Sequence, residues 1–155
     1  MDHIDRVVAH VKGLSGFEVL PPFEPYTHIG AVIVDGVLQA GLKWDTVVRK
    51  RVDAVAAIES ARTTRGFLAL LRARGAEAVL SWRGGRKPRL AVALAELLEQ
   101  EHVDTVSDLR TWLQHPDAPE RLTTLHGIGP KTVDYLKGLV GLPAVAIDIH
   151  LSRFL

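Results

Sequence analysis

Two side chains between Leu122 and Arg153 are of types that could do chemistry together. Lys131 stands two residues after a Gly-Ile-Gly tripeptide at 127–129, and Asp148 follows about one helix and one loop later in an otherwise apolar run. A lysine amine that attacks the C1′ atom of a nucleoside forms a Schiff base, whose iminium accepts electrons when the 3′ phosphate is eliminated. A nearby carboxylate stabilises the positive charge that develops on the sugar as the base leaves. The pair therefore has the types needed to open a glycosidic bond.

The lysine lies in a segment that predicts a tight turn between two helices, Leu-Thr-Thr-Leu-His-Gly-Ile-Gly-Pro-Lys-Thr at 122–132. Glycines on both sides of one apolar residue permit backbone angles that a Cβ would obstruct, and Ile128 is expected to point into the core. Pro130 suits the first turn of the second helix, where its missing N–H is no loss. The amides at that helix start and in the turn favour a phosphate group. Gly-x-Gly alone also fits an ordinary glycine-rich turn between helices.

Apolar residues recur at spacings of three and four along almost the whole chain, and no period-2 strand pattern is present, so the sequence predicts an all-α fold. The three prolines at 17–25 indicate a linker. The predicted helices with two defined ends cover 3–11, 26–40, 45–58, 64–74, 76–82, 117–124 and 130–139. Asp45 is the predicted N-cap of the third of these, and Thr63 or Thr64 caps the fourth. Three further helices are predicted: one with Pro88 in its first turn that reaches about 101, one that begins at Thr105 or Ser107 and ends before Pro116, and one that begins at Asp148.

Composition is that of a globular chain, with 155 residues of which 47% are hydrophobic and 24% charged. No apolar run approaches the length of a membrane span, and the first ten residues lack the pattern of a signal peptide. Because there is no cysteine, disulfides and a cysteine-ligated iron–sulfur cluster are excluded. These features fit a reducing cytoplasm, and we expect the protein there, associated with the nucleoid.

The net charge of +1 does not by itself indicate a nucleic-acid partner. Nucleic-acid binding needs one positive face rather than a high total charge, because phosphate neutralisation supplies most of the affinity. Basic residues gather in three clusters, which could form such a face or simply be solvated helix surfaces: residues 49–51, Arg72 with Arg74, and Arg83, Arg86, Lys87 and Arg89.

The segment 122–132 resembles a helix-hairpin-helix motif, which grips the DNA backbone without reading its sequence. Together with Val145-Ala-Ile-Asp-Ile-His150, it resembles the HhH-GPD superfamily of base-excision DNA glycosylases, and its pattern is similar to that of endonuclease III. The resemblance is tight over 122–153 and extends more loosely back through Arg86-Lys87 to the apolar segment 29–39. It implies that Lys131 is the nucleophile, that Asp148 is the essential carboxylate, and that the enzyme is both a glycosylase and an abasic-site lyase.

The same resemblance implies further binding residues on double-stranded DNA that carries a damaged base or an abasic site. The hairpin would commonly hold a monovalent cation, Na⁺ or K⁺, through the main-chain carbonyls of Thr123, Leu125 and Ile128. Gln39 would fill the gap left by the rotated base, and His150 is expected to be a packing residue. The residues expected to contact DNA are Gly127, Gly129, Lys131, Thr132, Gln39 and Lys87. Trp44, Trp82, Trp112 and Tyr135 are expected to pack within the protein, with Trp44 the best placed to reach a base.

The fold that the resemblance implies is a helical barrel that carries the hairpin motif at about 119–139, with part of a split second helical domain. We expect residues 1–24 to be the N-terminal helix and linker of the split domain, 25–141 to be the barrel, and 142–155 to be the loop of the catalytic aspartate and the start of the second half of the split domain.

Two departures from the family pattern bear on this interpretation. The iron–sulfur cluster is absent, and the chain stops at Leu155, where relatives continue with several helices that form one wall of the cleft. We therefore expect either a fragment of a longer protein or a minimal form completed by a partner or a second copy. Two alternatives stay open, a non-catalytic helix-hairpin-helix DNA-binding protein and a glycosylase in which Lys131 only holds phosphate. The sequence does not specify the lesion or the oligomeric state.

Overall fold

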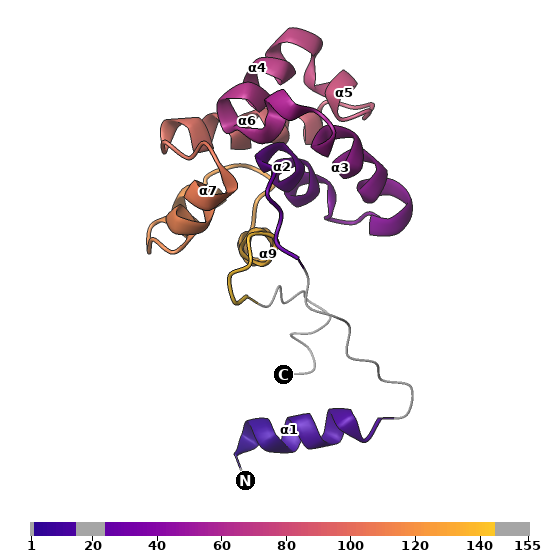
Figure 1. Cartoon of the computed structure of the whole chain (residues 1–155), viewed down its shortest axis with the longest axis vertical. Helices are drawn as coiled ribbons and strands as arrows, with labels where there is room; N and C mark the ends of the chain where they lie inside the picture. Colours follow the sequence, from indigo (N-terminus) through magenta and orange to yellow (C-terminus); the bar gives the residue numbers. More distant parts are fainter. Residues whose placement is uncertain (1, 15–23, 145–155) are drawn as a thin grey trace.

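A computed structural model describes residues 2–14 and 24–144 of the chain. Every regular element within these residues is helical and none is a strand, which confirms the predicted all-α class (Figure 1). The elements are α1 (His3–Lys12), α2 (Ile29–Leu38), the π-helical turn η1 (Trp44–Val48), α3 (Arg49–Ala56), the 3₁₀ turn η2 (Glu59–Arg62), α4 (Thr64–Arg74), α5 (Ala76–Val79), α6 (Arg86–Gln100), α7 (Val106–Leu113), α8 (Ala118–Thr123) and α9 (Pro130–Leu139).

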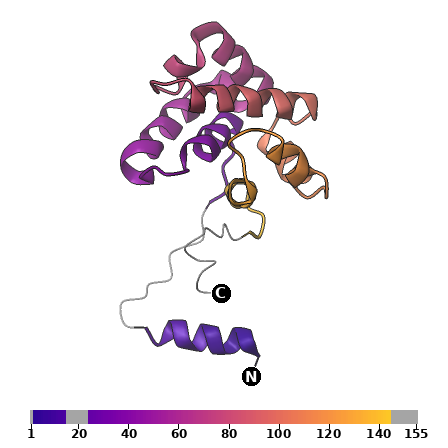
Figure 2. The same ribbon diagram turned by 180° about the vertical axis from the view of Figure 1, so that it is seen from behind.

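Helix α2 lies in the middle of the bundle, with α3, α4, α6 and α9 against it (Figures 1 and 2). Its sequence, IGAVIVDGVL, is apolar on every face, and all its residues are buried, as expected for a helix hydrophobic all round. Two glycines allow neighbours to approach closely. A Cβ on Gly36 would lie 2.6 Å from Cδ2 of Leu136 in α9, and a Cβ on Gly30 would lie 2.8 Å from the carbonyl oxygen of Ala61. The small residues of α2 thus set its distance from α9 and η2.

A single hydrophobic core runs from Ile29 to Val140 within the described residues. Its largest fully buried side chains include Phe67, Leu80 and Leu94, contributed by α4, the end of α5 and α6. The core falls inside the segment 25–141 that was predicted to form the barrel. The barrel architecture, the split second domain and the helix from Asp148 stay predictions, since residues 15–23 and 145–155 lie outside the described residues.

Helix α2 begins later than predicted, at Ile29 rather than at Tyr26. Residues before it are extended because other partners satisfy their polar groups. The His28 ring nitrogen Nδ1 accepts the amide of Ala31 at 3.2 Å and caps the helix, and the Tyr26 amide donates to the carbonyl of Leu139 at 3.0 Å. The segment before α2 is therefore held against the end of α9.

The prediction that Asp45 caps a helix over 45–58 was wrong. Lys43 precedes the first turn, and Asp45 lies inside it, exposed and without a capping bond. The turn is π-helical over Trp44–Val48 before the α-helical pattern begins at Arg49. This wider turn accompanies a bond from the Trp44 indole N–H to Asp35 in α2, a tertiary contact that no local pattern reveals.

Other predicted boundaries agree more closely with the structure. Thr63 caps α4 through its hydroxyl, which accepts the Gly66 amide at 3.1 Å, and α4 ends at Gly75, whose φ is +82°. Helix α6 has Pro88 in its first turn, and α9 spans the predicted residues. Thr105 and Asp108 form a reciprocal capping box at the start of α7. Helix α5 is shorter than the predicted 76–82 and ends at Val79.

Helix α1 is amphipathic, and it lies apart from the bundle in Figure 1. None of its residues is buried, and Ile4, Val7 and Val8 are exposed on one side. Its apolar face therefore has no covering partner among the described residues. Among those residues there is also no helix with the length and hydropathy needed to cross a membrane.

Candidate nucleic-acid interface

Helices α8 and α9 and the turn between them form the hairpin that the sequence predicted. The turn closes with short-range bonds, from the Leu125 amide to the Leu122 carbonyl and from the Ile128 amide to the Leu125 carbonyl, each 3.1 Å. Ile128 is only 5% exposed and belongs to the hydrophobic core, which confirms its predicted direction. One apolar side chain thus fastens the turn while its backbone stays at the surface.

The two glycines of the turn have different physical reasons to be glycine. Gly127 has φ of +107°, which L side chains rarely adopt, and a Cβ there would lie 3.0 Å from Cδ2 of Leu90 in α6. Gly129 has φ of −109° and ψ of −178°, an extended conformation open to any residue, and a Cβ there would meet no atom within 4 Å. The prediction that both glycines relieve the backbone is therefore confirmed for Gly127 and wrong for Gly129.

Helix α9 begins without a side-chain cap. Gly129 occupies the N-cap position and has no side chain to offer, Pro130 is the first helical residue, and Lys131 is the second. Lys131 is exposed, whereas Thr132 is 8% exposed. The positive end of the α9 dipole and an exposed ammonium or amine therefore occupy the same helix start.

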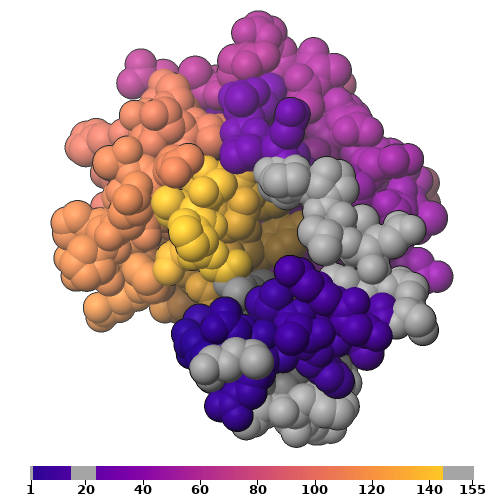
Figure 3. Space-filling view, turned by 60° about the horizontal axis from the view of Figure 1, so that its bottom comes forward, coloured from indigo at the N-terminus to yellow at the C-terminus, as the bar shows by residue number. Residues whose placement is uncertain are grey.

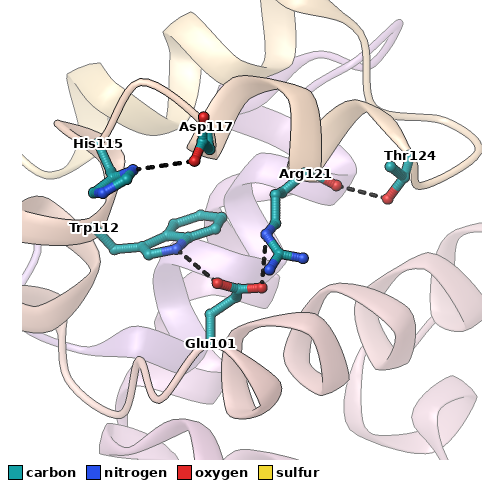
Figure 4. Close-up of polar contacts among 6 residues, drawn as sticks. All are labelled: Glu101, Trp112, His115, Asp117, Arg121 and Thr124. Carbon is teal, nitrogen blue, oxygen red and sulfur yellow. Dashed lines mark hydrogen bonds and ion pairs between the residues drawn. The ribbon is translucent and has the colours of Figure 1, made fainter.

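Polar contacts hold α8 against the rest of the bundle (Figure 4). Glu101, at the end of α6, accepts the Arg121 guanidinium at 3.0 Å and the Trp112 indole N–H at 3.2 Å. The Thr124 hydroxyl donates to the Arg121 carbonyl at 2.6 Å at the end of α8. Because Glu101 side-chain exposure is only 16%, this carboxylate is screened less than a surface ion pair would be. The first helix of the hairpin is thus anchored to α6.

A second polar cluster surrounds the carboxylate of Asp35 in α2, the helix against which α9 packs. Asp35 is 1% exposed and accepts three hydrogen bonds, from the Tyr26 hydroxyl at 2.7 Å, the Trp44 indole at 3.3 Å and the Tyr135 hydroxyl at 2.8 Å. Burial, with the neighbouring carboxylate, raises the pKa of Tyr26 and of Tyr135 well above the usual value, so both keep their protons to donate. Tyr135 is four residues after Lys131 and so one helical turn along the same face of α9.

The sequence reasoning missed Asp35. The signal was nevertheless present, because Asp35 is the one charged residue in the ten-residue apolar helix α2. A carboxylate in such a helix requires buried donors, since burying it unpaired would cost several kcal/mol. Tyrosines and tryptophans elsewhere in the chain were the candidates, and spacing alone does not say which of them reach it.

Two residues expected to contact DNA, Gln39 and Lys87, have side chains that lie near the end of α2 and are partly enclosed by the protein. Gln39 is half-buried, and its amide nitrogen is enclosed without a hydrogen-bond partner in the described part of the chain. The Lys87 ammonium donates to the carbonyls of Val37 at 2.9 Å and Ala40 at 3.2 Å, and so caps the end of α2. Lys87 therefore has a structural role, and DNA contacts by Gln39 and Lys87 stay predictions.

The basic clusters are only partly available to a partner. Arg51 donates to the carbonyls of Val47 and Ser81 and lies 5.1 Å over the Trp82 ring, and Arg72 is 3.5 Å from Glu96. Trp82, Trp112 and Tyr135 are partly buried, in agreement with their predicted packing, whereas Trp44 is 37% exposed. Trp44 stays the aromatic side chain best placed to meet a base.

The remaining predicted site residues are Asp148, His150 and the carbonyls of the cation site. Asp148 and His150 lie outside the described residues, so their positions relative to Lys131 stay predictions. Of the three carbonyls predicted to hold a monovalent cation, those of Thr123, Leu125 and Ile128, the Leu125 carbonyl accepts one hydrogen bond within the turn and keeps a second lone pair. The cation and the role of Asp148 stay predictions.

Replacement of Asp35 by alanine is expected to destabilise the protein strongly, because three donors, two of them on partly buried tyrosines, would lose their acceptor. The expected loss is about 3 kcal/mol in the free energy of unfolding, or a fall of roughly 10 °C in Tm. Thermal unfolding followed by circular dichroism measures it. Asp45→Asn is the matched control, since Asp45 is exposed and uncapped, and it should leave Tm almost unchanged. Equal melting of the two variants would contradict the role given to Asp35.

Comparison with known proteins does not place the chain in a family: no family model, curated protein or solved structure matches it.

Proposed function

We propose that the protein is a base-excision DNA glycosylase with abasic-site lyase activity, which grips duplex DNA through the α8–α9 hairpin and uses Lys131 as nucleophile. The observation that supports this most is an exposed lysine at the second position of α9, directly after an uncapped glycine turn. A helix start of this kind offers amides and a positive dipole end to a phosphate. A DNA phosphate bound there would bring its sugar close to the Lys131 amine.

The setting of Gly129 supports contact with an outside group. Neither its backbone angles nor its neighbours within the protein require glycine, since a Cβ there would meet nothing within 4 Å. A residue without a side chain is needed where another molecule approaches the backbone closely. A DNA phosphate seated on the amides at the start of α9 would be such a molecule.

The proposed reaction begins with attack of the neutral Lys131 amine on C1′, which forms a C–N bond as the C1′–N bond to the base breaks. The departing base takes up a proton from solvent. One proton of the lysine nitrogen moves to the ring oxygen O4′ as the sugar ring opens, which gives a protonated Schiff base. Loss of a C2′ proton then sends its electron pair toward the iminium, and the C3′–O bond breaks with release of the 3′ phosphate. Asp148 would stabilise the positive charge on the sugar during the first step.

The base must leave the duplex stack before its C1′ atom becomes accessible. Trp44, which is 37% exposed, and Gln39 both lie at or just beyond the end of α2. An exposed indole offers a surface for stacking to a displaced base, and an amide side chain suits the gap that the base leaves. These assignments follow from the resemblance and from the position of both residues near the end of α2.

The second candidate is a non-catalytic DNA-binding protein with the same hairpin. The hairpin geometry alone supports binding, while the chemistry also requires a carboxylate near Lys131. Salt-sensitive DNA binding without strand cleavage would favour this alternative. Base release without a covalent adduct would favour a glycosylase in which Lys131 only holds phosphate.

Substitution of the two turn glycines separates binding from folding. Gly129→Ala is expected to keep the wild-type Tm but to weaken binding to duplex DNA by about tenfold, as loss of a charge-assisted phosphate contact would. Gly127→Ala is expected to cost about 1–3 kcal/mol of stability because of its backbone angle and the contact with Leu90. Fluorescence anisotropy at fixed salt and thermal melts provide both readouts. Unchanged DNA affinity in Gly129→Ala would argue against the hairpin as the grip.

Borohydride trapping on a duplex with one abasic site tests the nucleophile. The wild-type protein should form a covalent adduct, and Lys131→Ala should lose it while its DNA affinity falls only modestly. Lys137→Ala is the matched control. Lys137 lies in the last turn of the same helix, and its ammonium nitrogen is 3.9 Å from a carboxylate oxygen of Asp134. It should trap as the wild type does. Equal trapping by the Lys131 variant would falsify the assignment.

Asp148→Asn tests the carboxylate that the proposed mechanism needs. Single-turnover base release should slow by orders of magnitude if the charge stabilises the transition state. A change under about threefold, which is well below one kcal/mol, would mean that Asp148 only caps a helix. Trapping on an abasic site, where no base has to leave, should be less affected than base release.

A further inference from the structure

Helix α1 carries an apolar stripe that nothing in the described part of the chain covers. None of the residues of this helix is buried, and Figure 3 shows α1, in indigo, on the outside of the molecule. Five large hydrophobic side chains are exposed among the described residues, and four of them lie in α1 or directly after it: Ile4, Val7, Val8 and Leu14, with Trp44 the fifth. Exposed apolar side chains gathered in one patch, rather than scattered singly, indicate an interaction surface.

The helix also needs a partner for its own stability. It has ten residues, and isolated helices shorter than about 12–15 residues are marginal in water, because most helical stability in proteins comes from packing of an apolar face. Spacings of three and four residues place Ile4, Val7, Val8 and Val11 on one face. The Leu14 amide donates to the Val11 carbonyl at 3.2 Å, so Leu14 extends this stripe beyond the last turn. A second helix laid along the stripe would bury it.

The stripe reads the same in both directions along the helix. Ile4, Val7, Val11 and Leu14 follow one another at spacings of three, four and three residues. Two copies of α1 packed antiparallel therefore place Ile4 against Leu14 of the second copy, and Val7 against Val11 of the second copy. Such a pair has two-fold symmetry, in which one surface patch meets the same patch of the other copy. The pattern thus fits a second copy of this chain.

The charges of α1 favour the same antiparallel arrangement. Asp5 lies in the first turn and Lys12 in the last, and because they are seven residues apart they share one flank of the stripe. Two-fold antiparallel pairing brings the same flank of both helices together, so Asp5 of each copy comes within one residue of the position opposite Lys12 of the other. Opposite ends of the two helix dipoles also meet. Neither side chain has an ion pair within the described residues.

We propose that α1 is a self-association helix, which pairs antiparallel with α1 of a second copy along the stripe that runs from Ile4 to Leu14. This inference does not rest on the proposed function, since it uses no residue of the hairpin. A ten-residue helix is about 15 Å long, and a pair of them buries less than the roughly 1,200 Å² of a standard stable interface. We therefore expect a weak dimer with a Kd of about 10⁻⁴ M.

Sedimentation equilibrium of the full chain, from about tenfold below to tenfold above this Kd, tests the association. The mean mass should rise from that of one chain toward that of two. Val7→Asn should raise the Kd about tenfold or more, because each dimer loses two buried valines. Since α1 buries none of its residues in the bundle, the variant should keep the wild-type Tm.

Ala9→Asn is the matched control, because Ala9 is exposed on the opposite face of α1 and should leave the Kd near that of the wild type. It introduces the same side chain and lowers helix propensity more than Val7→Asn does, since alanine is the strongest helix former. A selective loss in Val7→Asn thus reports the apolar face. A chain that stays monomeric at every concentration, a wild-type Kd in Val7→Asn, or equal weakening in both variants would overturn the proposal.

Disulfide cross-linking tests the direction of the pair. The chain has no cysteine, so Ile4→Cys and Leu14→Cys introduce single thiols. Under mild oxidation a mixture of the two variants should form a disulfide between unlike chains, because antiparallel pairing places these positions opposite each other. Ile4→Cys alone should stay unlinked, since the two copies of this residue lie at opposite ends of the pair. A disulfide between two Ile4→Cys chains, identified by mass spectrometry, would mean a parallel pair and overturn the proposed arrangement.

Discussion

The buried carboxylate of Asp35 is the constraint on which the arrangement of the candidate site depends. A charge in the centre of an apolar bundle is tolerated only when donors surround it, and here they come from three other parts of the chain. Tyr26 precedes α2, Trp44 begins η1, and Tyr135 lies in α9. Satisfying one carboxylate therefore fixes the position of α9, and with α9 the start of the hairpin helix that carries Lys131. An apolar residue at 35 would permit these elements to pack but would not specify their register.

Packing and polar anchoring have separate roles in holding the hairpin. Ile128 buries the turn, Gly36 allows α2 and α9 to approach, and Glu101 binds α8 through Arg121. None of these contacts uses the backbone at the start of α9. The contacts that hold the hairpin thus lie away from the surface that would meet a phosphate. Rigid support around a polar surface is the arrangement that binding sites need, because binding then costs little ordering of the protein.

The sequence predicted the elements that local chemistry decides and missed those that tertiary contacts decide. Helix α9, the Thr63 cap and the stop at Gly75 were predictable because proline, threonine and glycine have strong positional preferences. The π-helical turn at Trp44 and the late start of α2 were not, since both depend on bonds to residues distant in sequence. In the site, the hairpin and the buried Ile128 were predictable, while the partners of Asp35 required coordinates.

The two lysines at helix starts show why spacing alone does not assign a chemical role. Gly85-Arg86-Lys87 and Gly129-Pro130-Lys131 share one local pattern, a glycine N-cap followed by a lysine at the second helical position. Lys87 is turned onto the carbonyls at the end of α2, which commits two of its three protons, whereas Lys131 is exposed. A lysine bound to two carbonyls is held in one place and is poorly suited to attack a sugar. Of the two, Lys131 has the exposure that a nucleophile requires, while Lys87 stabilises the end of α2.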